Sequence, residues 1–276
     1  MTYRSLLVYV DRGLESDQRV ALACDLACRL DARLIGLSGS VPEADLSDPY
    51  AGGAMVGEAL TLLRDCALED VKAARERFSD LTDFCPDRTE WRSEIAYPAD
   101  LVARAARAAD LVIVGRTHDR SPYHNLDPSD ALMTAGRPVL VTPPSPSRAP
   151  VGGRAVVAWK DTPQARRAVL DALPLLKRAS AVHVLSLSSE DGLAEATAGA
   201  ADVAEYLRRH GVAAIVAARL RHPGSVAAQI LAFARAEAAG LVVAGGYGHA
   251  RMREWALGGV TRALIADCPV CLLLAH

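Results

Sequence analysis

The sequence predicts an α/β protein made of two tandem doubly wound domains, each a five-stranded parallel sheet flanked by helices. Short runs of Val, Ile and Leu occur without polar alternation, which is typical of strands buried on both faces of a sheet. These runs alternate with longer helical patterns, and that order gives right-handed βαβ units. The same blocks recur in the same order in both halves of the chain, which indicates a tandem duplication.

The duplication is clearest around the last two expected strands of each half. AADLVIVGRTH at Ala108–His118 resembles AAGLVVAGGYG at Ala238–Gly248. RPVLV at Arg137–Val141 likewise resembles CPVCL at Cys268–Leu272. At the front of each half, LLVYVD resembles AVVAWKD.

The two copies meet at TPPSPSRAP, residues 142–150, whose prolines and serines are typical of a stiff, solvated linker. We therefore expect one domain at residues 1–145 and a second at residues 151–276. A chain of 276 residues is long enough for two domains of ordinary size.

Each half supplies five strands and four helices. In the first half the strands are expected near Leu6–Val10, Arg33–Leu37, Glu90–Ile95, Leu111–Val114 and Val139–Val141. The helices between them are expected near Ser16–Leu30, Gly57–Phe78, Asp100–Ala108 and Ser129–Ala135. In the second half the strands are expected near Ala155–Trp159, Val182–Leu187, Ala213–Ala218, Leu241–Ala244 and Val270–Leu274. The matching helices are expected near Pro163–Leu176, Ala194–His210, Ser225–Ala238 and Gly259–Ala266.

Composition excludes several classes of protein. The net charge is −2 and only 5% of residues are aromatic, which argues against nucleic acid as a partner. No stretch of about 18 uncharged apolar residues is present, so we expect no membrane span. The N-terminus shows no signal peptide pattern, and we expect a cytoplasmic chain with reduced cysteines. Lysine is rare, at Lys72, Lys160 and Lys177 alone, so a lysine placed in a site stands out.

In open parallel sheets, ligands bind beyond the carboxyl ends of the strands, where the strand order reverses. The first and fourth strands of each half flank that point. In the first half these strands end at Asp11 and Gly115. In the second half they end at Lys160, followed by Asp161, and at Gly245.

The loop after the fourth strand of the second half, GGYGHARMREWALGGVTRALI, has the features of a phosphate site. Gly245 and Gly248 are expected to form tight turns of positive φ, where a phosphate approaches the backbone. Gly258 and Gly259 would then open a helix whose free N–H groups favour an anion. The charged or hydroxyl side chains of the loop, with the helix start, complete the candidate set: His249, Arg251, Val260 and Thr261.

This pattern resembles the universal stress protein family, over essentially the whole chain and twice. Three sequence features account for the resemblance: the acidic turn after strand one, the G-x2-G-x9-G loop after strand four, and the final CPV strand. The resemblance implies a Rossmann-like, adenine nucleotide alpha hydrolase-like fold. In the ATP-binding branch of that family the loop cradles the triphosphate and an Asp after strand one touches the nucleoside. Mg²⁺ is expected only together with ATP.

The second half keeps most of that motif. Its three glycines match at Gly245, Gly248 and Gly258. A glycine, Gly259, stands at the Ser/Thr position, with the hydroxyl of Thr261 two residues later, and Lys160 stands at the acid position. We therefore place the candidate nucleotide site in the second domain. The competing interpretation is that the glycines are inherited scaffold.

The first half retains the acidic residue after strand one but not the glycine pattern of the loop after strand four. Asp11 matches the family acid, but the loop reads Gly115-Arg-Thr-His118 and reaches Pro128-Ser129 where a third glycine would stand. Proline has no N–H, so this helix start offers one donor fewer to an anion. We therefore do not expect a first-half nucleotide site built from Asp11, Gly115, His118 and Ser129 to hold a triphosphate in the family manner.

Several other residues have two readings. Lys160 either meets a phosphate or is an exposed loop lysine beside Asp161, and Trp159 either packs on a nucleoside or belongs to the core. Cys24 and Cys28 are one helical turn apart and are either half a metal site or buried small residues. We expect loop residues rather than a metal site at His118 and His124.

Cys268 and Cys271 form a C-x-x-C string, but on a strand these positions face opposite sides about 10 Å apart. That spacing is beyond disulfide reach, so we expect core cysteines. No Walker A, G-x-S-x-G or H-E-x-x-H motif occurs, and we assign no catalytic residue and no metal.

The resulting expectation is a stress-response binding or regulatory module that senses ATP or another small ligand in its second domain. The alternatives are a weak ATP hydrolase or phosphoryl-transfer enzyme, and a nucleotide-independent interaction protein. The final strands of the two halves are very apolar edges that need cover. We expect them to pack against each other as an internal pseudo-dimer, and a further homodimer stays open.

Overall fold

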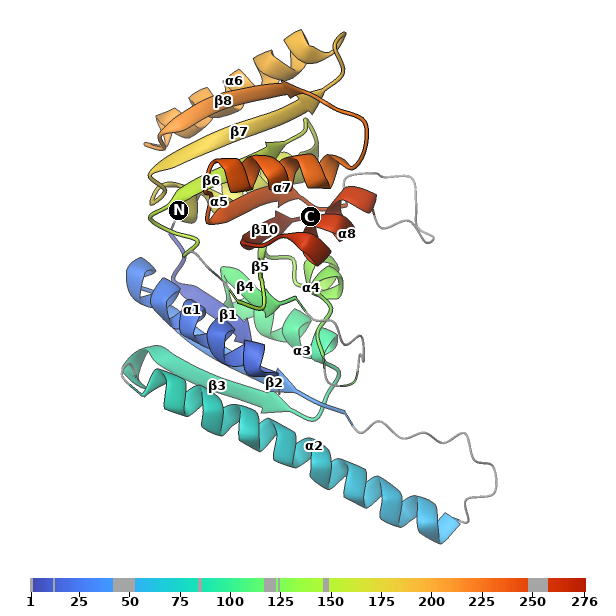
Figure 1. Cartoon of the computed structure of the whole chain (residues 1–276). Coiled ribbons are helices and arrows are strands. Elements are labelled where there is room, and N and C mark those ends of the chain that lie inside the picture. Colours follow the sequence, from blue (N-terminus) through green and yellow to red (C-terminus); the bar gives the residue numbers. More distant parts are fainter. Residues whose placement is uncertain are drawn as a thin grey trace.

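A computed structural model shows the arrangement of the chain (Figure 1). The structure describes residues 2–11, 13–41, 53–83, 86–116, 123, 125–145, 149–247 and 258–276. All ten expected strands lie in one sheet, in the order β3-β2-β1-β4-β5-β10-β9-β6-β7-β8. Within the described residues, no helix combines the length and the apolar character that a bilayer crossing requires.

Each half contributes five parallel strands. The first half contributes β1 (Ser5–Tyr9), β2 (Arg33–Gly39), β3 (Thr89–Glu94), β4 (Leu111–Gly115) and β5 (Val139–Thr142). The second half contributes β6 (Arg154–Trp159), β7 (Ala181–Ser188), β8 (Ala214–Leu220), β9 (Leu241–Gly245) and β10 (Cys271–Ala275). The expected α/β class with parallel strands is confirmed.

The halves join through their last strands. β10 pairs with β5 in antiparallel register, with Leu273 opposite Leu140. Each of these strands is fully buried along its length. The apolar edges expected to cover one another therefore do so, and they close two five-stranded sheets into one.

Helices cover both faces of this sheet (Figure 1). One apolar core lies under α1 (Leu14–Leu30), α2 (Gly53–Thr82), α5 (Pro163–Leu176) and α6 (Leu193–Arg209). The other lies under α3 (Pro98–Ala105), α4 (Pro128–Thr134), α7 (Val226–Ala236) and α8 (Gly259–Asp267). Helices on both faces are what continuous apolar strands require.

Some element boundaries differ from expectation. α2 is longer at both ends than expected, and the helix expected to reach Ala108 ends at Ala105 and continues as a short 3₁₀ turn over Ala106–Ala108. β10 spans Cys271–Ala275 and so begins and ends one residue later than expected.

Hydrogen bonds also link the halves outside the sheet. The buried hydroxyl of Tyr3 donates to the carbonyl of Asp171 at 2.5 Å. Arg116, directly after β4, donates to the carbonyl of Ala266 at 2.6 Å, near the end of α8. A cation at a helix C-terminus also interacts favourably with the helix dipole. The first half thereby fixes the far end of the helix that opens the candidate site.

Strand register relates the halves residue by residue. In β1, Leu6 pairs with Leu111, the first residue of β4. In β6, Ala155 pairs with Leu241, the first residue of β9. Leu6 therefore corresponds to Ala155.

The helices that follow keep this alignment, because α1 and α5 begin at the same distance after those positions. Counting along both copies, Asp11 corresponds to Lys160 and Arg19 corresponds to Ala168. These two replacements distinguish the two candidate sites.

Candidate functional site

The first-half site is filled by the side chain of Arg19, from the second turn of α1. Its Nε donates to the carbonyl of Tyr9 at 2.8 Å, and its Nη2 donates to Ser16 Oγ at 3.0 Å and to Asp11 Oδ2 at 2.5 Å. The Arg19 side chain is 3% exposed. The carboxylate that the family resemblance assigns to a nucleoside is therefore held by the protein's own cation.

Gly115 gives Arg19 the space that it occupies. A Cβ on Gly115 would lie 1.7 Å from Nη1 of Arg19. This glycine lets a guanidinium lie directly against the end of β4. The point where the strand order reverses is thus closed by side chains in the first half.

The first-half helix start carries negative charge. Asp127 caps α4, and its Oδ1 accepts from the N–H of Ser129 at 2.7 Å. Asp130 lies in the first turn, where burial and the neighbouring Asp127 raise the pKa of its carboxyl. Pro128 removes a further donor. An anion therefore meets carboxylates here, whereas His118 of the same candidate set lies outside the described residues.

The second-half site has no counterpart of the Arg19 side chain. Ala168, at the position of Arg19, is a buried apolar residue with 1% exposure. Lys160, at the position of Asp11, is exposed after the end of β6. Its neighbour Asp161 bonds to Arg166 at 2.6 Å, between two exposed side chains. Lys160 is thus an exposed residue beside Asp161, whose carboxylate pairs with Arg166.

Gly245 serves close packing rather than a turn. The prediction that Gly245 has a positive φ is wrong; among the described residues that follow β9, Tyr247 has a positive φ, of 51°. A Cβ on Gly245 would lie 2.5 Å from the backbone nitrogen of Ala165, at the start of α5. The glycine is required because the end of β9 and the first turn of α5 approach too closely for a side chain.

The start of α8 differs from that of α4. Gly258 is the N-cap, and no side chain in the described part of the chain caps the helix. A Cβ on Gly258 or on Gly259 would meet nothing within 4 Å. Val260 follows with 40% of its surface exposed. Among the described residues, no side chain therefore caps the first N–H groups of α8, and an uncapped helix start is the arrangement that binds anions.

Two other expected site residues are buried, and three lie outside the described residues. Thr261 is buried, and its Oγ1 accepts from the N–H of Tyr247 at 3.4 Å. Trp159 is 9% exposed and belongs to the core under α5 and α6, in line with its core reading. The remaining three loop residues of the set fall outside the described residues: Gly248, His249 and Arg251.

A buried side-chain oxygen of Gln164 at this edge has no hydrogen-bond partner among the described residues. Oε1 of Gln164, in the first turn of α5, is buried and accepts no hydrogen bond from any described residue. The backbone of Gln164 adjoins Gly245 and hence the end of β9. Buried acceptors are nearly always bonded, so this oxygen is a candidate contact for a ligand donor.

The sequence interpretation missed Arg19 and Asp127. Arg19 belongs to a helix of mixed composition, and no local pattern shows that its side chain turns inward. Asp127 does have a signal, because Asp followed by Pro is typical of an N-cap and first helical residue. Applying that rule would have identified α4 as self-capped.

The C-x-x-C cysteines are core residues, as expected. Cys271 faces the core under α1 and α5, whereas Cys268 faces the core under α7 and α8, on the opposite side of the sheet. Burial raises the pKa of the Cys268 thiol to about 11 and that of Cys271 to about 12. Such thiols stay neutral and unreactive at ordinary pH.

Comparison with protein families matches residues 153–276 to the universal stress protein family. No curated protein sequence matches the chain. Among solved structures, the chain is similar to a universal stress protein from Archaeoglobus fulgidus, with a TM-score of 0.68 and 16% identity over 99% of this chain and 98% of that one. It is also similar to a functionally unknown protein from Pseudomonas aeruginosa, with a TM-score of 0.58 and 15% identity over 99% and 92% of the two chains. At these identities the likeness shows the fold.

Proposed function

The chain belongs to the universal stress protein family through its second half, residues 153–276, and on this premise we propose that the second half binds ATP at the edge where β6 and β9 end. The observation that carries the proposal is the contrast between two equivalent helix starts. α4 is capped by Asp127, whereas α8 begins at Gly258 and Gly259 with no side-chain cap from the described residues. An uncapped helix start offers N–H donors and a favourable dipole to a phosphate.

Two side chains at this edge suit the rest of the nucleotide. Lys160 is an exposed cation in the place where the first half has Asp11, and a lysine interacts with phosphate as a point charge. The unpartnered Oε1 of Gln164 is an acceptor that suits a ribose hydroxyl or the adenine amino group. The phosphates of ATP would thus meet the cation of Lys160, and a hydroxyl or amino donor of ATP would meet the acceptor of Gln164.

Magnesium enters this proposal only with the triphosphate. No group of three or more His, Cys, Asp or Glu side chains that could hold a metal occurs in the described part of the chain. Mg²⁺ commonly binds through substrate phosphates and water rather than through an all-protein cage. We expect ATP–Mg²⁺ to bind as one unit, in the cytoplasm, and the chain to act as a sensor of this ligand.

The test is isothermal titration of the purified full chain with ATP–Mg²⁺. Gly258→Asp copies the cap of α4 and places a carboxylate where the phosphate would lie. We expect this variant to lose at least tenfold in affinity. Asp127→Asn is the matched control in the first half and should leave affinity unchanged. Wild-type affinity in Gly258→Asp would overturn the proposed site.

Phosphate release, followed in the same samples, separates a sensor from a hydrolase. A binding module releases phosphate no faster than ATP does in buffer. Release that depends on Gly258 would instead support the enzymatic alternative. Absence of both binding and release would leave a nucleotide-independent interaction protein.

A further inference from the structure

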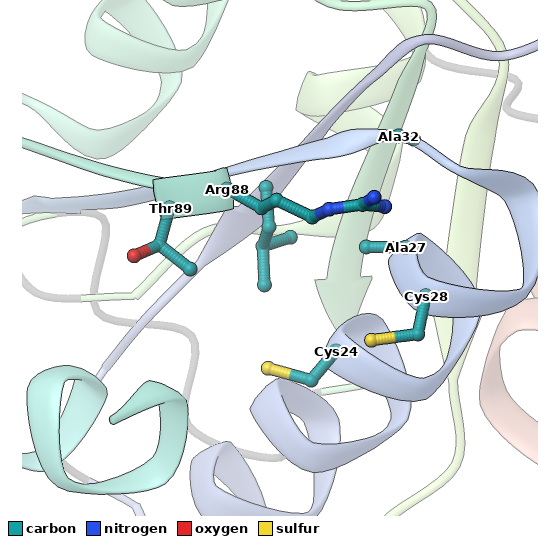
Figure 2. A pocket seen from close by; sticks show the side chains of 7 residues that line it. Cys24, Ala27, Cys28, Ala32, Arg88 and Thr89 are labelled. Atoms are coloured by element: carbon teal, nitrogen blue, oxygen red, sulfur yellow. The ribbon is translucent and has the colours of Figure 1, made fainter. Parts of the chain in front are cut away.

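A pair of thiols on α1 faces a small hollow at one edge of the sheet. Cys24 and Cys28 lie one turn apart near the end of α1, and both sulfurs point to the same side of the helix (Figure 2). The hollow lies at the amino ends of β2 and β3. Its lining consists of the two cysteines, three apolar residues, an arginine and a threonine: Cys24, Ala27, Cys28, Ala32, Leu34, Arg88 and Thr89.

The expectation that both thiols are buried is wrong for Cys28. Cys24 is 5% exposed, whereas Cys28 is exposed, because the last turn of α1 reaches the rim of the sheet. Neither thiol is part of a disulfide. One sulfur is therefore sheltered and the other is reachable from solvent, an arrangement that lets a small ligand enter.

Helix geometry decides what can bridge the pair. Residues four apart on a helix have Cβ atoms about 5–6 Å apart. A disulfide needs Cβ atoms about 3.5–4.5 Å apart, so this pair is too wide to oxidise without distorting α1. A metal–sulfur bond is about 2.3 Å, so a two-coordinate ion spans roughly 4.6 Å between sulfurs. The spacing suits a bridging ion.

Charge around the hollow favours a monovalent ion. Two thiolates and one monovalent cation leave one net negative charge. Arg88 lines the hollow, and its Nη1 donates to Asp31 Oδ1 at 2.8 Å. Arg4 donates to the other Asp31 oxygen at 2.9 Å, so two cations and one carboxylate leave one net positive charge. The net positive charge of this exposed cluster balances the net negative charge that the two thiolates and a monovalent ion would carry.

From this geometry we infer that Cys24 and Cys28 form a two-coordinate site for a soft monovalent metal ion of the copper(I) class. Soft thiolate ligands select such ions. On binding, each thiol releases its proton to water and each sulfur forms one metal–sulfur bond, with no change of oxidation state. The described residues contain no third His, Cys, Asp or Glu placed to complete a zinc site. The inference is independent of nucleotide binding.

The test is an anaerobic titration of the reduced full chain with Cu(I), in competition with the chromogenic chelator bicinchoninate. We expect one tightly held ion per chain. Cys28→Ala should lower affinity at least 100-fold, and Cys24→Ala should do the same. Cys66→Ala, which removes an exposed thiol on α2, is the matched control and should leave affinity unchanged.

Cys28 is the decisive position because its exposed side chain can be shortened without leaving a cavity, and circular dichroism checks the fold of each variant. Arg88→Gln should weaken binding about threefold to tenfold while keeping one ion per chain. Retention of wild-type Cu(I) affinity in Cys28→Ala would overturn the inference. Equal loss in Cys66→Ala would overturn it too, by showing that thiols bind without regard to place.

Discussion

The guanidinium of Arg19 lies 2.5 Å from the carboxylate of Asp11, and this pair closes the first-half counterpart of the candidate nucleotide site. Arg19 also donates hydrogen bonds to Tyr9 and to Ser16, at the end of β1 and in the first turn of α1, and its guanidinium lies against Gly115 at the end of β4. In the second half, Ala168 replaces the arginine and Lys160 replaces the acid. The first-half site is thus filled by a side chain of its own half, whereas in the second half no described side chain caps the start of α8.

Replacing Arg19 tests how much the Arg19–Asp11 pair contributes to the free energy of unfolding. Arg19→Met leaves the carboxylate of Asp11 beside a buried apolar side chain, and breaking a buried pair from one side costs about 3–5 kcal/mol. Urea unfolding should show that loss. Arg29→Gln, which breaks an exposed pair with Asp25, should cost no more than about 0.5 kcal/mol. A loss under about 1 kcal/mol for Arg19→Met would contradict this role.

The cap of α4 makes a separate prediction about stability. Asp127→Ala removes an N-cap and should lower the free energy of unfolding by about 1 kcal/mol. Gly258→Asp supplies an N-cap to α8 and should leave stability unchanged or slightly raised. Denaturation of both variants checks this, and a destabilised Gly258→Asp would show that the start of α8 is not open.

Close packing at the end of β9 predicts that Gly245 tolerates no side chain. Gly245→Ala would place a Cβ 2.5 Å from backbone in α5, which cannot yield as a side chain would, and we expect a loss of about 1–3 kcal/mol. Gly259→Ala is the matched change, because nothing lies within 4 Å there. Equal unfolding curves for the two variants would refute the packing explanation.

Thiol reactivity should divide the cysteines by burial. Iodoacetamide at pH 8 should label Cys28 and Cys66, which are exposed. Cys268 and Cys271, with pKa values raised by burial to about 11 and about 12, should react only after unfolding in urea. Peptide mass spectrometry reads out each site, and fast labelling of Cys271 in the native chain would contradict its place in the core.

The same shifts predict that alkali weakens the fold. Unfolded cysteines lose their protons near pH ~8.5, whereas the buried thiols keep theirs until their raised pKa values are reached. The unfolded state therefore binds fewer protons in that window, and the free energy of unfolding falls as pH rises. Burial raises the pKa of Tyr3 as well, which adds to the loss above pH ~10. Cys271→Ala should make the decline shallower, and an unchanged slope would disprove the contribution of this thiol.

Much of the fold follows from local sequence pattern. The repeat gives two copies of one strand order, and the apolar final strands require mutual cover, which the pairing of Leu273 with Leu140 provides. Both conclusions depend on periodicity and on apolar character, which each segment shows by itself. Element ends are harder, because α2 extends beyond its apolar pattern at both ends.

The candidate site depends on contacts that no local pattern contains. Arg19 turns inward because Gly115, at the end of another strand, leaves room for it. Gly245 looks the same in sequence whether it forms a turn or packs against α5, so the sequence indicated a glycine requirement but not its cause. The hollow beside Cys28 likewise depends on Arg88, which follows α2 in the chain.

The central claim is that the two halves differ, with ATP binding in the second half alone. Hydrogen–deuterium exchange of the full chain, with and without ATP–Mg²⁺, locates binding directly. We predict slower exchange in peptides that cover β9 and the start of α8, and no change in peptides that cover Asp11 to Arg19 or α4. Protection of the first-half peptides, or the absence of protection at α8, would contradict this division.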